Sequence, residues 1–166
     1  VKQHSEIQAV TWIPRIPAAR RGELESRMQD AGFDAFTVIT LDHRNRRRVE
    51  AQYDTYWPIC YARPCPSKQP FLGLNLSGFP EKQRLLETIL AEDKPMAATV
   101  LRTGGRTIEP GTHCLYVPVH ETAGSTQTEH ITGLVGVYLD MNELLQRLRA
   151  QCPHDIQIAW DEQLPL

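Results

Sequence analysis

The residues best suited to chemistry in this sequence are four cysteines and the histidines near one of them. Cys60 and Cys65 flank residues 61–64, whereas zinc and redox pairs usually enclose about two residues, and no CxxC motif completes a metal site. A nucleophilic Cys114 would need a base, but His113 is its neighbour in a predicted strand, where adjacent side chains point to opposite faces. We therefore expect neither metal nor cofactor, and a small thiol-dependent enzyme using Cys114 is kept as an alternative.

The cysteine count also bears on the compartment. An even number of cysteines is compatible with an oxidising environment, without requiring one. If any pair forms a disulfide, Cys60 with Cys65 is favoured, and the short loop it closes would contribute about 2 kcal/mol. Buried free thiols are the alternative.

Other candidate motifs have simpler explanations. The basic run of Arg44, Arg46, Arg47 and Arg48 lacks interleaved aromatic residues, so we interpret it as a solvated turn and expect no nucleic-acid partner. Gly104 and Gly105 do not have phosphate-loop spacing and indicate a hairpin turn. Asp140 and Glu143 lie at a predicted helix start, where carboxylates cap the helix. No catalytic constellation emerges.

Length and composition indicate one globular domain. The chain has 166 residues, of which 41% are hydrophobic, and its 18 Lys and Arg against 20 Asp and Glu give a net charge of -2. The apolar content excludes a disordered chain, and the near-neutral net charge excludes a general attraction to polyanions. No apolar stretch approaches the roughly 18 residues of a membrane helix. The chain begins at Val1 rather than Met, as an excised segment would, so the absence of a signal peptide or of membrane anchors from it excludes neither.

The elements needed to position a site follow from periodicity and from turn residues. Helices are predicted from the apolar spacing of Ile7, Val10 and Ile13, over Ala18 to Asp30, over Pro80 to Glu92, and over Asn142 to Arg149. Strands are predicted over Phe36 to Leu41, near Val49, and over Tyr56 to Tyr61, Met96 to Leu101, His113 to His120, Ile131 to Leu139 and Ile156 to Trp160. In the Pro80 helix, the apolar stripe includes Leu85 and Ile89, and Lys82 is assigned to the opposite, charged side. The fold class is α+β, an antiparallel sheet with helices on one face.

Proline and glycine interrupt the apolar strand segments. Pro58 and Pro118 cannot donate ladder hydrogen bonds and are expected at edges, bulges or strand ends. Gly133 and Gly136 remove side chains from a core strand, leaving space for a close backbone or a ligand. We interpret them as the floor of a ligand cavity, with a strand bulge as the alternative.

These same segments, in this order, resemble the CHASE domain, an extracytoplasmic sensor of plant cytokinin-receptor histidine kinases and of bacterial kinases and diguanylate cyclases. The matching blocks are Trp12 to Ile16, Tyr56 to Ile59, Leu72 to Asn75 ahead of the Pro80 helix, Leu115 to Val119, and Gly133 to Val137 followed by Asp140, Leu144 and Leu145.

The resemblance implies a PAS-like module after a stalk helix. Residues 1–16 would end the stalk, residues 17–150 would form the membrane-distal ligand-binding module, and residues 151–166 would begin a membrane-proximal module or a C-terminal strand. It further implies a periplasmic or extracellular location, dimerisation through the stalk, and no catalysis by this domain. A cytoplasmic PAS or GAF-type regulatory module is the main alternative.

The resemblance also suggests a ligand site. Plant members have an Asp that binds the adenine edge of cytokinin where this chain has Asn75, and the Thr and Ser of the plant pattern are replaced by Ala98 and Thr99. An Asn can pair bidentately with adenine, accepting from N6 and donating to N7. A different small, neutral, partly apolar ligand is an equal expectation. The predicted contact residues are Leu74, Asn75, Tyr61, Ala98, Thr99, Tyr116, Gly133, Val135 and Gly136.

Overall fold

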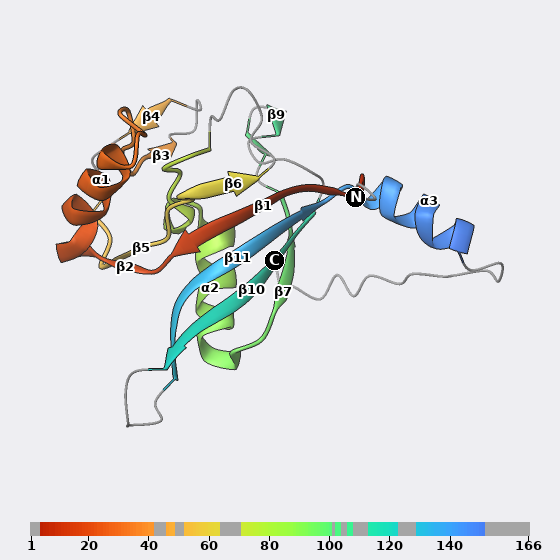
Figure 1. The fold of residues 1–166 in the computed structure, drawn as a ribbon. Helices are drawn as coiled ribbons and strands as arrows, with labels where there is room; N and C mark the ends of the chain where they lie inside the picture. The colour runs from red at the N-terminus through yellow and green to blue at the C-terminus, as the bar shows by residue number, and fades with distance from the viewer. Residues whose placement is uncertain are drawn as a thin grey trace.

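The computed structural model describes residues 4–41, 46–48, 52–63, 71–100, 102–103, 106–107, 113–122 and 129–151 (Figure 1). Its strands are β1 (Ile7–Pro14), β2 (Ile16–Pro17), β3 (Thr40–Leu41), β4 (Arg47–Arg48), β5 (Thr55–Tyr56), β6 (Tyr61–Arg63), β7 (Met96–Thr99), β8 (Arg102–Thr103), β9 (Arg106–Thr107), β10 (His113–Thr122) and β11 (Glu129–Leu139). Its helices are η1 (Ala18–Arg20), α1 (Arg21–Asp30), η2 (Leu76–Gly78), α2 (Pro80–Glu92) and α3 (Met141–Gln151).

Five strands form the central antiparallel sheet in the order β6-β1-β11-β10-β7. The three-strand meander predicted near the C-terminus is confirmed as β7, β10 and β11. Helix α2 packs along one face of this sheet, whereas α1 lies beside it and α3 extends away from its end (Figure 1). The predicted α+β, PAS-like class is therefore confirmed.

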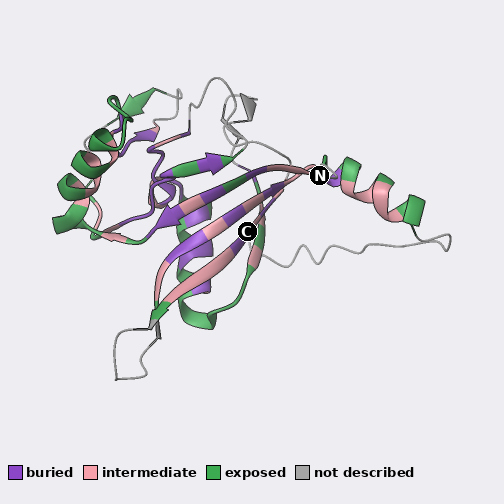
Figure 2. Ribbon diagram, viewed as in Figure 1, coloured by how far each residue is buried: buried purple, intermediate pink, exposed green. Residues whose placement is uncertain are grey.

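The main core lies between the sheet and α2. Along each long strand, buried and partly exposed residues alternate, as expected when only one face is fully covered (Figure 2). From α2, Leu85, Leu86 and Ile89 pack into this core. A second cluster beside α1 is built around the buried Phe36 and Cys60.

The helix predicted at the N-terminus is wrong. Residues Ile7–Pro14 form β1, which pairs with both β6 and β11. Ala9, Thr11 and Ile13 are buried while Val10 is exposed, so the true period is two. The division into stalk and modules remains a prediction, and the strand expected at residues 156–160 lies outside the described residues.

The remaining helices agree well with the sequence. The Ala18 to Asp30 prediction is met by η1 and α1, and α2 has the predicted bounds. The capping role of Asp140 is confirmed, because its carboxylate accepts from the backbone N–H of Asn142 at 2.9 Å and of Glu143 at 3.2 Å. No helix among the described residues is long and apolar enough to cross a bilayer.

Pro118 pairs with Leu134 of β11 and lies past the stretch of β10 that pairs with β7, an edge position of the kind that the sequence predicts. It follows the last residue of β10 that pairs with β7, Tyr116, and precedes a bulge between Val119 and His120. The missing N–H of proline therefore costs no bond to β7.

Two predicted strands are shorter than expected. Of Phe36 to Leu41 only β3 is a strand, and Tyr56 to Tyr61 is divided between β5 and β6. The rest of the backbone in these two stretches forms hydrogen bonds with segment 71–76 instead. The Ile39 N–H donates to the Gly73 carbonyl at 2.8 Å, and the Ile59 N–H donates to the Leu74 carbonyl at 3.0 Å. This segment thus runs between the two former strand candidates and fixes the position of Asn75.

Acidic and basic groups join the start of β1 to α3. Glu6 pairs with Arg147 of α3 and with His4, the latter at 2.9 Å. These bonds, led by the one to His4, lower the pKa of Glu6 to about 2. The backbone N–H of Asp140 also donates to the Glu6 carbonyl at 2.8 Å, so the first described residues are tied to the last helix.

Candidate functional site

The segment that carries Asn75 is held tightly by its neighbours. Gly73 has φ +80, and a Cβ there would lie 2.2 Å from the Thr37 carbonyl oxygen, so only glycine permits this approach. Asn75 N–H donates to the Ile39 carbonyl at 2.8 Å, and Leu76 N–H donates to the Trp57 carbonyl at 3.0 Å. The backbone on both sides of Asn75 is therefore fixed.

The Asn75 side chain is fully buried and only half used. Its Oδ1 accepts from the backbone N–H of Trp57 at 2.8 Å and of Ser77 at 3.3 Å. Its Nδ2 is buried and has no hydrogen-bond partner. Because a backbone N–H can only donate, the oxygen must face Trp57 and Ser77, and the amide NH₂ must face the interior. A buried unpaired amide is costly, which makes this atom a candidate ligand contact.

A second buried polar group, Lys82, lies on α2. Its side chain is 1% exposed, and Nζ donates to the Tyr116 hydroxyl at 2.7 Å and to the Thr99 carbonyl at 3.0 Å. Nζ also lies 4.8 Å from the centroid of the Tyr116 ring. The assignment of Lys82 to the solvent side is therefore wrong. Its spacing from Leu85, Leu86 and Ile89 shows the reason, since i, i+3, i+4 and i+7 share one helix face.

The ladder divides the predicted contact residues between two faces of the sheet. Tyr116 lies opposite Gly136, and Ala98 opposite the buried Cys114, so these side chains face α2. Leu74, which is fully buried, belongs to the same core.

Four others, Gly133 among them, face away from α2. Val135 pairs with Trp12, which pairs in turn with Tyr61, a residue that is 47% exposed. The Thr99 side chain also lies on that face, although its carbonyl meets Lys82. One small molecule cannot contact both sets, so the structure brings together Asn75, Leu74, Tyr116, Ala98 and Gly136 at most.

The space beside the strand glycines is occupied by protein. A Cβ on Gly133 would lie 2.4 Å from Cη2 of Trp12 and 2.9 Å from the Ile13 carbonyl oxygen. A Cβ on Gly136 would lie 2.6 Å from Thr11 Oγ1 and 3.2 Å from Cys114 Sγ. Both glycines thus permit close packing in β11, and the interpretation of Gly133 and Gly136 as a cavity floor is corrected accordingly.

The two cysteines that the structure describes, Cys60 and Cys114, give no support to thiol chemistry. Cys60 carries a free, buried thiol, and burial raises the pKa of this thiol to about 12. Cys65, its favoured partner if any disulfide forms, lies outside the described residues. Cys114 is likewise outside any disulfide and fully buried, and its sheet neighbour His113 lies on the opposite face. Neither thiol has the exposed, electropositive setting of a nucleophile.

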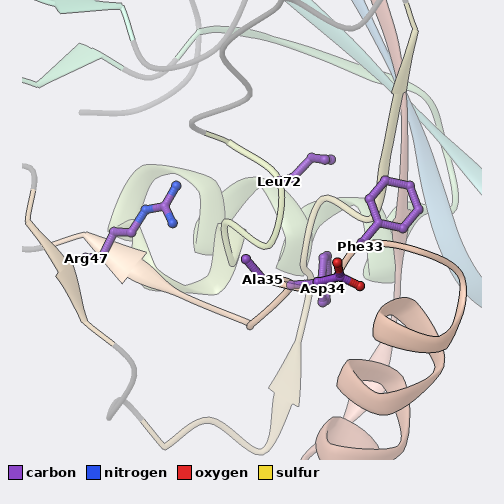
Figure 3. Close-up of a pocket in the computed structure, with 6 residues that line it drawn as sticks. Phe33, Asp34, Ala35, Arg47 and Leu72 are labelled. Atoms are coloured by element: carbon purple, nitrogen blue, oxygen red, sulfur yellow. The ribbon is translucent and has the colours of Figure 1, made fainter.

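Two cavities lie outside this buried cluster. One of about 230 Å³ is bounded by Phe33, Asp34, Ala35, Phe36, Arg47 and Leu72, and Arg47 faces Phe33 and Asp34 across it (Figure 3). The other, of about 360 Å³, lies between β5, η2 and α2, and its lining includes Trp57 and Ser77, whose N–H groups hold Asn75. Neither cavity is lined by Asn75 or Lys82.

Comparison with known families decides the relationship. A sequence model of the CHASE domain matches residues 1–163, nearly the whole chain. The chain belongs to the CHASE domain family. The resemblance seen in the sequence is thereby confirmed, whereas a search of curated proteins finds no match.

CHASE domains are extracellular sensor domains of signalling proteins, and they bind small ligands rather than catalyse reactions. This CHASE domain is thus extracytoplasmic in type, which opposes the cytoplasmic alternative. Asn75, which the sequence resemblance sets against the plant Asp, presents an amide whose oxygen is already used. The bidentate adenine pairing expected of Asn75 therefore has only its donor half available.

Proposed function

We propose that this chain is the ligand-binding part of an extracytoplasmic sensor in a membrane-bound histidine kinase or diguanylate cyclase. A small molecule binds in the core between the sheet and α2, where it accepts a hydrogen bond from Asn75. The sensor protomers pair through stalk segments that precede β1.

The observation that carries the proposal is the unpaired Nδ2 of Asn75. It is fully buried, its orientation is fixed by two backbone N–H groups, and it belongs to the Leu72 to Asn75 block, one of those on which the sequence resemblance rests. Leaving such a donor unpaired costs about 1 to 3 kcal/mol, a cost that a ligand acceptor would remove.

Signalling requires that the ligand prefer one conformation of the domain. Segment 71–76 contacts the strands on both sides of it and leads through η2 into α2, so a ligand at Asn75 acts directly on the helix that covers the sheet. A difference in ligand affinity of about 5- to 150-fold between two packings, or about 1 to 3 kcal/mol, is enough for coupling.

The experiment is a thermal-shift screen with adenine derivatives, amino acids and small organic acids, followed by Asn75→Asp. A ligand at about 100 times its Kd adds about 2.7 kcal/mol to stability, which raises Tm by about 5 to 11 °C for a chain of this size. Asn75→Asp keeps an oxygen for Trp57 and Ser77 but removes the NH₂, so the shift should disappear while the unliganded domain stays folded.

Asn142→Asp is the matched control, since it makes the same change at an exposed position in α3. It should leave the shift intact. Asn75→Ala is a poorer variant because it would leave two backbone N–H groups unpaired and destabilise the free domain. A ligand shift that survives Asn75→Asp unchanged would contradict the proposal.

A further inference from the structure

The smaller of the two cavities brings together three parts of the chain that are distant in sequence. Its volume is about 230 Å³, and it is lined by the turn after α1, by β4 and by the start of segment 71–76 (Figure 3). Phe36 belongs to the cluster beside α1, whereas Leu72 packs against the main core. A molecule bound here would therefore contact both clusters and the segment that carries Asn75.

Most of the lining of this cavity is apolar. Phe36 is buried, and its backbone is fixed, because its N–H donates to the Phe33 carbonyl at 2.7 Å and its carbonyl accepts from Gln29 Nε2 at 3.0 Å. Leu72 is half-buried, and the Phe33 ring is 38% exposed. A ligand with an apolar segment would cover Phe33 and remove its exposed surface from water, which favours binding.

One cation and one anion face this apolar surface from opposite sides. Arg47 lies on one side of the cavity, and Asp34 lies beside Phe33 on the other (Figure 3). Both are exposed, and within the part of the chain that the structure describes neither side chain has a hydrogen-bond or ion-pair partner. Arg46 and Arg48, in contrast, already interact with other groups. Arg47 is therefore the arginine of the β4 region that is available to a ligand in this cavity.

The two charges restrict the ligands that fit. An anion that binds Arg47 also meets the Asp34 carboxylate, and a cation that binds Asp34 also meets the Arg47 guanidinium, so a single charge is opposed by one of the two groups. Arg47 and Asp34 are too far apart to form an ion pair with each other, so a ligand that contacts both must carry separated charges. The cavity is smaller than the roughly 300 to 1,000 Å³ of most pockets for drug-sized molecules, which limits its ligand to a small one.

We propose that this cavity binds a small ω-amino acid, whose carboxylate pairs with Arg47, whose ammonium pairs with Asp34 and whose methylene chain covers Phe33. A guanidinium can hold a carboxylate through two parallel N–H groups, which fixes the direction of the ligand. The site is separate from the core site proposed at Asn75, which does not line the cavity. Leu72 joins the two sites, because it belongs to the same segment as Asn75.

A series of ligands tests the geometry on the unaltered chain. Glycine, β-alanine, γ-aminobutyrate, δ-aminovalerate and ε-aminocaproate carry the same two charges at increasing separation, and isothermal titration calorimetry gives the Kd of each. Affinity should rise to an optimum at one of the longer members, since the charges of glycine lie too close together to reach both side chains. Valerate and pentylamine each lack one charge and should bind about fivefold or more weakly than the tightest member.

Variants then assign the effect to Arg47 and Asp34. Arg47→Gln and Asp34→Asn should each weaken the tightest ligand by about fivefold or more. The matched controls are Arg15→Gln and Asp30→Asn, the same changes at exposed positions outside the cavity, and they should leave the Kd unchanged. The double variant Arg47→Asp with Asp34→Arg should recover binding, because a linear ω-amino acid can then bind in the reverse direction. Circular dichroism checks that each variant is folded, and the ligand series needs no variant.

The outcomes distinguish this cavity from the core site. Binding that is lost in Arg47→Gln and kept in Asn75→Asp supports the inference, and the core site is then judged on ligands that Arg47→Gln does not affect. Binding that is kept in Arg47→Gln and lost in Asn75→Asp would overturn the inference and support the proposed function. The inference also fails if no ω-amino acid binds, or if valerate or pentylamine binds as tightly as the best member of the series.

Discussion

Replacing Gly133 with alanine tests whether the strand glycines serve close packing or an empty cavity. A Cβ there would lie 2.4 Å from Cη2 and 2.8 Å from Cζ2 of Trp12, and 2.9 Å from the Ile13 carbonyl oxygen. Carbon atoms in contact prefer about 3.5 to 4.0 Å, so the ring or the strand must move by more than about 1 Å. Overpacking of this kind costs about 1 to 3 kcal/mol.

Part of that cost is offset, because alanine loses less backbone entropy than glycine on folding, by about 0.5 to 1 kcal/mol. The net destabilisation of Gly133→Ala should be about 1 to 2 kcal/mol, or a fall in Tm of about 2 to 8 °C. Urea and thermal unfolding followed by circular dichroism measure it. Gly22→Ala is the matched control, since a Cβ at this position in α1 would have no atom within 4 Å, and it should stabilise slightly.

A double-mutant cycle with Trp12→Phe completes the test. Phenylalanine lacks the two ring atoms nearest to Gly133, so the double variant should be more stable than the sum of the single changes by about 0.5 to 2 kcal/mol. The packing argument is refuted if the free energy of unfolding of Gly133→Ala lies within about 0.3 kcal/mol of that of the unaltered chain and the cycle shows no coupling to Trp12. The space beside β11 would then be open.

Further predictions concern single groups. The pKa of Glu6 is lowered from 4.5 to about 2, so its contribution to stability is complete above pH 4.5 and is lost as the pH falls towards 2. In acid titrations, the difference in stability between the unaltered chain and Glu6→Gln should therefore shrink over that range. The Cys60 thiol, with its pKa raised to about 12, should react with a thiol reagent at pH 8 only after unfolding, and rapid labelling of the folded domain would contradict its burial. Asp140→Ala should cost about 0.5 to 2 kcal/mol in urea unfolding by removing the cap of α3, whereas an unchanged midpoint would show that the cap is dispensable. Tyr116→Phe removes an acceptor of Lys82 and should lower the free energy of unfolding by about 1 to 3 kcal/mol. An unchanged free energy of unfolding would show that water can replace the Tyr116 hydroxyl as a partner of the ammonium.

The parts of the fold that the sequence predicts well are those with one clear local signal. Helix α2 has a proline at its first position and an apolar stripe, and β10 and β11 alternate over ten or more residues. Strand β1 resembles a helix in sequence because Ile7, Val10 and Ile13 match a helical spacing, while its true partners, β6 and β11, are distant along the chain. Long-range pairing decides such segments, and local periodicity does not contain it.

The candidate site shows a similar division. Family resemblance locates Asn75, but the direction in which its amide points depends on the N–H groups of Trp57 and Ser77. Those groups can orient Asn75 because segment 71–76 takes the place of regular strand pairing. No pattern of residue types predicts that segment 71–76 replaces strand pairing there. The donor-only character of Asn75 is therefore visible in the three-dimensional structure and not in the sequence.

Lys82 is a different case, because the signal is present in the sequence. It stands three, four and seven residues before Leu85, Leu86 and Ile89, so helical geometry alone places it on the apolar stripe. A lysine is usually expected to be exposed to solvent, but its spacing along the helix decides whether it is buried once the helix packs on a sheet. Long lysine side chains on such a stripe usually reach water with their charged end, whereas Lys82 bonds to Thr99 and Tyr116 inside the core. A buried ammonium is expensive to maintain for packing alone, since an apolar residue of similar size would fill the same place. The bonds from Lys82 to the Tyr116 hydroxyl and the Thr99 carbonyl offset part of that cost, so the buried lysine is held by specific polar partners and not by its position on the stripe alone.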